Sequence, residues 1–217
     1  MAYDLEEQEQ LASLQAFWKQ YGNLLTWALI IVLGSYAGYN FWTYHQRSQA
    51  SDASVLYDEL QKSLAANDNA KVQRIASDVQ SKFGGTAYAQ MAALGAAKGA
   101  FEANDLKTAK TQLQWVVEHG SDEYKSIAKL RLAGVLLDEK AYDEALKVLG
   151  TEFGAQFAAA VADRKGDVLV AQNKLAEARA AYVVAYAAMD KKNPGRQLVQ
   201  VKLESIGGSV ATPKAPA

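Results

Sequence analysis

Cysteine is missing from the 217-residue sequence, and proline occurs only near its end, at Pro194, Pro213 and Pro216. The absence of cysteine excludes disulfide bonds, a thiol nucleophile and cysteine-ligated metal sites. It does not indicate on which side of a membrane the chain lies. A long stretch that is free of proline and rich in alanine favours helix.

Neither sign of charge dominates, since 23 basic residues stand against 24 acidic ones. After residue 50 the balance is 21 basic to 20 acidic residues. A domain that binds nucleic acid carries an excess of basic residues, usually gathered on one face. We therefore expect no nucleic-acid partner.

Residues that build catalytic or metal sites are scarce as well. The two histidines, His45 and His119, have no second ligand one turn away on the same helix, which argues against a metal site. Pairs of acidic residues at 122–123, 138–139 and 143–144 fall at turns or in first helical turns, where carboxylates stabilise a helix. We predict no catalytic residue, no cofactor and no metal. The alternative from a different functional class is a membrane-bound enzyme with an unrecognised active site.

A long uncharged segment is the first feature that is present. No side chain from Gln20 to Gln46 carries a full charge, and the apolar centre runs from Leu24 to Trp42. A helix of about 20 residues crosses about 30 Å of hydrocarbon. The segment is too long for a cleaved signal peptide, and the residues before it are acidic rather than basic. We predict a single transmembrane helix over residues 23–45.

Two further patterns accompany this predicted span. Apolar residues at helical spacing follow an acidic start, which predicts an amphipathic leader at the membrane surface over residues 1–22. Inside the span, Gly34 and Gly38 form a GxxxG pair, with Asn40 beside them. Small residues four apart let two helices approach closely, and asparagine can bond across them, so these three are candidates for packing against a partner helix. One basic residue flanks the span on each side, and the charges leave its orientation open.

Beyond the span, apolar residues follow a helical period that is interrupted by short polar breaks. The breaks lie at residues 67–69, 104–105, 119–121, 139–140 and 173–174. Segments of about a dozen residues between such turns indicate helical hairpins. Ser121 and either Asn104 or Asp105 are expected to cap helix N-termini.

Three alanines mark a repeat, because Ala109, Ala145 and Ala178 each follow a turn and recur at a nearly constant interval. Twelve positions before each alanine comes a small residue, and four positions after it a large one. The small residues are Ala97, Ala133 and Gly166, and the large ones are Leu113, Leu149 and Tyr182. A period of about 34 residues with this pattern is typical of the tetratricopeptide repeat.

The predicted fold is therefore all-α: the transmembrane helix, then a tetratricopeptide-like solenoid of helical hairpins over residues 46–206. The solenoid begins with a degenerate pair over residues 54–82 and ends with a capping helix over residues 197–206. Residues 207–217 read as a disordered tail.

The first helix of each pair lines a concave groove in such arrays. The repeat frame places six candidate protein-binding residues there, followed by Asp163 and Asp167. The six are Met91, Leu94, Lys98, Phe101, Leu130 and Leu137. The apolar first part favours an extended or helical protein segment as the ligand. Lys98 is the only cation in this projection, which argues against recognition of a free C-terminal carboxylate. Internal packing, for example against the terminal helix, is the competing interpretation.

With anchor and repeats in place, the chain resembles the YfgM family of ancillary SecYEG translocon subunits. An acidic leader is followed by Phe17-Trp18-Lys19, by Tyr21-Gly22-Asn23, and by the segment from Asn40 to Gln46. The ending from Leu198 to Leu203 also looks like the terminal helix of that family.

The resemblance implies a cytoplasmic leader, a bacterial inner-membrane anchor surrounded by lipid, and a periplasmic repeat domain. It implies partners too: the SecYEG translocon, a PpiD-like membrane-anchored periplasmic chaperone, and exported client proteins. A scaffold for envelope assembly or cell division would have the same architecture and is the alternative.

Overall fold

The computed structural model describes residues 5–209, which contain α-helices and a short 3₁₀ helix but no strand. The elements are α1 (Leu5–Ala65), α2 (Asn69–Phe83), α3 (Ala87–Glu102), α4 (Leu106–His119), α5 (Asp122–Asp138), α6 (Tyr142–Leu149), η1 (Ala155–Phe157), α7 (Ala158–Ala171), α8 (Leu175–Ala188) and α9 (Gly195–Ser205). The all-α prediction is confirmed. The first four residues of the predicted leader, and the predicted tail from residue 210 on, lie outside the described residues.

The chain divides into two units, Met1–Gln49 and Ala50–Ala217. In the first unit the predicted leader and span are parts of one helix, because α1 continues through both without a break. Its large apolar side chains are exposed, for example Leu24 at 68% and Trp42 at 63%. By length and composition α1 can cross a membrane, and none of its most apolar stretch is buried within the protein.

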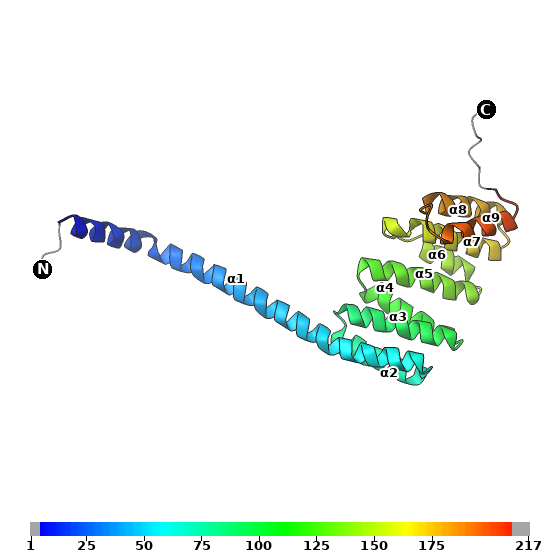
Figure 1. Ribbon diagram of the computed structural model, residues 1–217, viewed down its shortest axis with the longest axis horizontal. Coiled ribbons are helices and arrows are strands. Elements are labelled where there is room, and N and C mark those ends of the chain that lie inside the picture. The colour runs from blue at the N-terminus through cyan, green and yellow to red at the C-terminus, as the bar shows by residue number, and fades with distance from the viewer. Residues whose placement is uncertain (1–4, 210–217) are drawn as a thin grey trace, which may run out of the picture. The chain divides into compact units, whose positions relative to one another are not determined.

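The second unit is built of helical hairpins that follow one another in chain order (Figure 1). The end of α1 packs with α2, since Ala53 and Leu60 share a core cluster with Val72 and Val79. The next hairpins are α3 with α4, α5 with α6, and α7 with α8. The predicted degenerate first pair and the pairs after it are thus present.

One backbone conformation recurs at the turn inside each of these four hairpins. Asn67, Asn104, Lys140 and Asn173 have φ between 55° and 60°. In the second turn the Asn104 N–H donates to the Phe101 carbonyl, at 2.9 Å, and the next N–H donates to the Ala100 carbonyl, at 2.8 Å. This bonding satisfies carbonyls at the helix end, and asparagine tolerates the left-handed conformation that it needs. The predicted polar breaks therefore coincide with real helix ends.

The helix that follows the turn has a side-chain N-cap in the first two of these hairpins and none in the other two. Asp68 accepts a hydrogen bond from the Lys71 N–H, and Asp105 accepts one from the Thr108 N–H, each at 3.0 Å. Hydrogen bonding from the Thr108 side chain, and then from its N–H, lowers the pKa of Asp105 below its ordinary value, because both favour the charged carboxylate. The expected cap at Asp105 is confirmed.

Ser121 precedes α5, as expected, but its side chain does not cap that helix. Instead, its hydroxyl and its N–H both donate to Gln90 Oε1, at 3.4 and 3.1 Å. The prediction of a serine cap was therefore right in position and wrong in bonding.

Small and large residues complement each other in the hairpin cores. Ala97, Leu113, Ala133 and Leu149 are at most 3% exposed and lie in one core cluster. In the last hairpin the large residue is Tyr182, which is 3% exposed, and the small one is Gly166. A Cβ atom on Gly166 would lie 2.3 Å from a ring carbon of Tyr182. The sequence has glycine there because the tyrosine ring fills the space of a methyl group.

Helix α9 closes the solenoid at its C-terminal end. Val199 and Leu203 are at most 1% exposed and form a cluster with Ala162, Tyr182 and Ala185. Burial of this last apolar surface is the role of a terminal cap in repeat proteins. The predicted capping helix is confirmed, with its start two residues earlier than expected.

Candidate protein-binding groove

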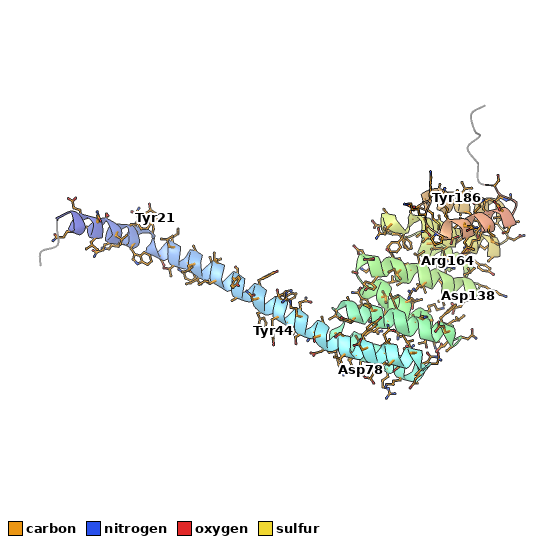
Figure 2. The ribbon with its side chains drawn as sticks, viewed as in Figure 1. Tyr21, Tyr44, Asp78, Asp138, Arg164 and Tyr186 are labelled. Carbon is orange, nitrogen blue, oxygen red and sulfur yellow. The ribbon has the colours of Figure 1, made fainter. Side chains whose placement is uncertain are left out.

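Two adjoining hollows run along the first helices of the hairpins. The first hollow has a volume of about 490 Å³ and lies between the end of α1, α3 and α5. The second hollow has a volume of about 280 Å³ and lies between α3, α5 and α7. Both are lined by Lys98 and Arg131, so we treat them as one surface, the groove. Figure 2 labels two side chains that line its second hollow, Asp138 of α5 and Arg164 of α7.

Five of the six predicted groove residues line these hollows. Met91, Leu94 and Lys98 line the first, and Lys98, Phe101 and Leu137 line the second. Phe101 is 43% exposed, so its ring offers apolar surface to a ligand. Leu94 is only 6% exposed and also belongs to the core. The groove and the core thus share side chains.

Leu130, the sixth predicted residue, lines neither hollow. It packs against the core cluster instead, and its neighbour Arg131 lines both hollows. A shift of one position along a helix turns a side chain by about 100°, which separates a core-facing residue from a groove-facing one.

Asp163 and Asp167 do not line the two hollows either, because they bind the capping helix α9. Lys202 of α9 donates to Asp163 at 2.9 Å and to Asp167 at 2.8 Å. The Tyr182 hydroxyl also donates to Asp167, at 2.9 Å. The competing interpretation, packing against the terminal helix, therefore holds for this pair.

The pKa values of this cluster are shifted by burial and by the two carboxylates. Burial raises the pKa of Tyr182, and its hydrogen bond to Asp167 raises it further, since both favour the neutral phenol. Burial alone would lower the pKa of Lys202. The hydrogen bonds and negative charges of Asp167 and Asp163 outweigh that effect and raise it. The cluster is thus arranged to keep Lys202 charged.

Two arginines that line the groove were not predicted from the sequence. Arg131 and Arg164 lie one repeat period apart and occupy the same position in successive repeats. Gly134 of α5 lies beside the second of them, since a Cβ atom there would be in ordinary van der Waals contact with the Arg164 guanidinium carbon, at 3.9 Å. The expectation that Lys98 is the only groove cation is therefore wrong. The offset of one repeat period was the signal that could have revealed both arginines.

The three groove cations are weakly neutralised. Lys98 lies 3.6 Å from Glu102 in an exposed pair on one helix, and Arg164 lies 3.5 Å from Asp167, which already binds Lys202. Arg131 has no ion-pair partner within the part of the chain that the structure describes. Exposed pairs of this kind contribute little energy, so the cations are available to a ligand.

The predicted packing residues of the anchor, Gly34, Gly38 and Asn40, lie at exposed positions of α1. A Cβ atom on Gly34 or Gly38 would meet nothing within 4 Å. The Asn40 side-chain amide donates to the Tyr36 carbonyl of the same helix, at 3.0 Å. Among the described residues there is no cluster of His, Cys, Asp or Glu that could hold a metal ion.

An exposed apolar helix joined to hairpins with a groove along their first helices defines a membrane-anchored helical-repeat protein. A family model described as a tetratricopeptide repeat-like domain matches residues 15–208. The chain is also similar to three bacterial proteins that are each named ancillary SecYEG translocon subunit, and it covers nearly all of their length. It therefore belongs to the family of ancillary SecYEG translocon subunits, which is not an enzyme class.

The identities are in the range of clear but distant homologues. The protein from Neisseria gonorrhoeae is 35% identical over 208 residues, covering 95% of this chain and all of the relative. The protein from Haemophilus influenzae is 32% identical over 207 residues, with the same coverage. The Escherichia coli protein is 30% identical over 202 residues, covering 92% of this chain and 96% of the relative. No solved structure matches the chain at a significant level.

Proposed function

We propose that this protein is a scaffold of the Sec translocon in the bacterial inner membrane. Residues 23–45 span the membrane, the leader of residues 1–22 lies in the cytoplasm, and the repeat domain lies in the periplasm. The groove binds a PpiD-like membrane-anchored chaperone and exported client proteins. The observation that carries the proposal is the joining of an exposed apolar helix to an open repeat groove, in a family whose members are named for the translocon.

The anchor is the part that we expect to meet the translocon. Its apolar side chains are exposed, and lipid or the apolar surface of another membrane helix would cover them. Gly34 and Gly38 leave an open strip that admits a second helix at close range. Leucines at both positions would block that approach and keep the segment apolar.

The test is purification of tagged protein from its own membranes in mild detergent, followed by mass spectrometry of the proteins that accompany it. One parallel sample carries an unrelated membrane span, and a second carries Gly34→Leu with Gly38→Leu. We expect translocon subunits and a periplasmic chaperone with the native span, and a marked loss of translocon subunits with either variant.

Recovery of cell-wall or division enzymes instead would favour the envelope-assembly scaffold and remove the translocon assignment. Equal recovery of translocon subunits by the native and the unrelated span would show that the anchor does not choose the partner.

The orientation can be tested separately, because the absence of cysteine makes single-cysteine variants unambiguous. Ser13→Cys lies in the leader and Ser81→Cys lies on α2, both at exposed positions. A membrane-impermeant maleimide added from the periplasmic side should label residue 81 and leave residue 13 unlabelled. The opposite labelling would reverse the proposed topology.

A further inference from the structure

The groove has a charge pattern that narrows the choice of ligand. The second hollow is lined by three cations, Lys98, Arg131 and Arg164, and by one carboxylate among the described residues, Asp138. This local excess of positive charge stands out in a repeat domain whose charges are balanced overall. A basic segment would be repelled there, and an acidic segment would be attracted.

Apolar surface lies directly beside these cations. Phe101 and Leu137 line the same hollow, and Phe101 leaves 43% of its surface exposed. Phe101 and Leu137 lie one repeat period apart and occupy the same position in the α3 and α5 repeats. A ligand that lies along the groove can therefore present an apolar side chain and a carboxylate to adjacent points of one surface.

The third residue of that series shows where the open surface ends. Val170 stands at the same position on α7, one repeat after Leu137, but it packs in the cluster that α9 covers. The carboxylates of Asp163 and Asp167 are likewise held by Lys202. The accessible cations thus belong to the portion of the groove on α3, α5 and the middle of α7.

We propose that this portion of the groove binds an extended polypeptide segment in which a side-chain carboxylate stands next to a large apolar residue. Arg131 holds the carboxylate, with Lys98 and Arg164 on either side of it in the repeat order, and the apolar residue packs on Phe101 and Leu137. Arginine suits this role because its planar guanidinium bonds both oxygens of a carboxylate. The proposal rests on the proposed function only in that the ligand is a protein.

The test uses the full chain in lipid nanodiscs and fluorescence anisotropy of a labelled ten-residue peptide. The peptide places glutamates on both sides of a phenylalanine and a leucine, and both of its ends are blocked, so that its only carboxylates are side chains. A matched peptide has glutamine in place of each glutamate. We expect the glutamate peptide to bind about tenfold more tightly at low salt, with the difference shrinking as salt is added.

Variants of the protein then locate the binding site. Arg131→Gln should weaken binding of the glutamate peptide about five- to tenfold, and Arg131→Lys should weaken it less. Lys107→Gln removes an exposed charge from α4, outside both hollows, and should leave binding unchanged. Arg131 is exposed, and a thermal melt confirms that each variant remains folded.

Three results would overturn the proposal: equal binding of the two peptides, equal losses for Arg131→Gln and Lys107→Gln, or no binding of either peptide. None of them bears on the purification of translocon subunits, which depends on the native anchor. Failure of the ligand proposal is thereby distinguishable from failure of the proposed function.

Discussion

The hairpin of α3 and α4 and the hairpin of α7 and α8 share one repeat frame, but their groove-facing side chains differ in exposure and in contacts. On α3 the groove-facing positions Lys98 and Phe101 are exposed. On α7 the matching positions are Asp167 and Val170, which contact the capping helix or its cluster. The repeat frame thus specifies which side chains face the groove, whereas α9 determines how much of the groove stays open.

The two hairpins also differ in how they are stabilised. The first has an aspartate cap at Asp105 and a leucine core at Leu113. The second has Lys174, which does not cap, and a tyrosine core at Tyr182. We expect the stability of the second hairpin to depend on the packing of the Tyr182 ring and on the contacts of Lys202 with Asp163 and Asp167.

The largest effect should come from the pairing of Gly166 with Tyr182. Gly166→Ala forces a methyl group against the ring and should cost about 2 kcal/mol, even after the gain in helix propensity. Tyr182→Leu should cost about 3 kcal/mol, because it leaves a cavity beside the glycine and removes the hydrogen bond to Asp167.

The double variant restores the alanine and leucine combination of the other hairpins, so its loss should be clearly smaller than the sum of the two single losses. Denaturant unfolding of the full chain in detergent, followed by circular dichroism, measures all three. Strictly additive losses would contradict the proposal that the small residue at position 166 compensates for the large side chain at position 182.

The second-largest effect on stability should come from the attachment of the capping helix α9. Lys202→Met removes the cation between Asp163 and Asp167 and should cost about 2 kcal/mol at pH 7. Asp163 then loses its ion-pair partner, and Asp167 keeps only the Tyr182 hydroxyl and the longer contact with Arg164.

The native cluster should also respond to alkaline pH. The pKa of Lys202 and the pKa of Tyr182 are raised in the folded chain. Their contribution is thus fully present below about pH 10, where both groups are protonated in the unfolded chain, and is lost as pH rises further. Melting temperatures at pH 8 and pH 11 should differ more for the native chain than for Lys202→Met. Parallel pH curves would argue against a role for Lys202.

The smallest effect should come from the missing cap on α8. Lys174 has φ −88° and ψ 62°, close to the φ −90° and ψ 75° of Asp105. Lys174→Asp should therefore accept a hydrogen bond from the Glu177 N–H and stabilise the chain by about 0.5–1 kcal/mol. Lys174→Asn is the control, since it caps without adding a negative charge. A melting temperature unchanged by both would indicate that this turn does not accept the cap.

Local features were predictable from the sequence, and long-range ones were not. The polar turns, the period and the exchange of small for large residues each depend on residues near one another in the repeat, so the hairpins followed from them. The pairing of Lys202 with Asp163 joins residues 39 positions apart, and no local pattern reveals it. Arg131 was missed because the repeat frame carries the position of Leu94 onto Leu130, one residue before the arginine, although the one-repeat spacing from Arg131 to Arg164 was visible.

The anchor, too, was predictable from the sequence only in part. Its length and composition indicated a membrane helix, and the structure adds that its apolar side chains find no cover within the described residues. Its partners and its orientation depend on molecules outside the chain, which no pattern within it specifies.

Photo-crosslinking in living cells can show whether other proteins bind in the open groove on α3 and α5. A photoreactive phenylalanine analogue would replace Phe101 in the groove or, in a separate strain, Lys107 on α4 of the same hairpin. We expect discrete crosslinked adducts with envelope proteins from position 101, lost when Arg131→Gln is added, and none from position 107. Adducts from position 107 alone, or equal patterns from both positions, would contradict binding in the groove.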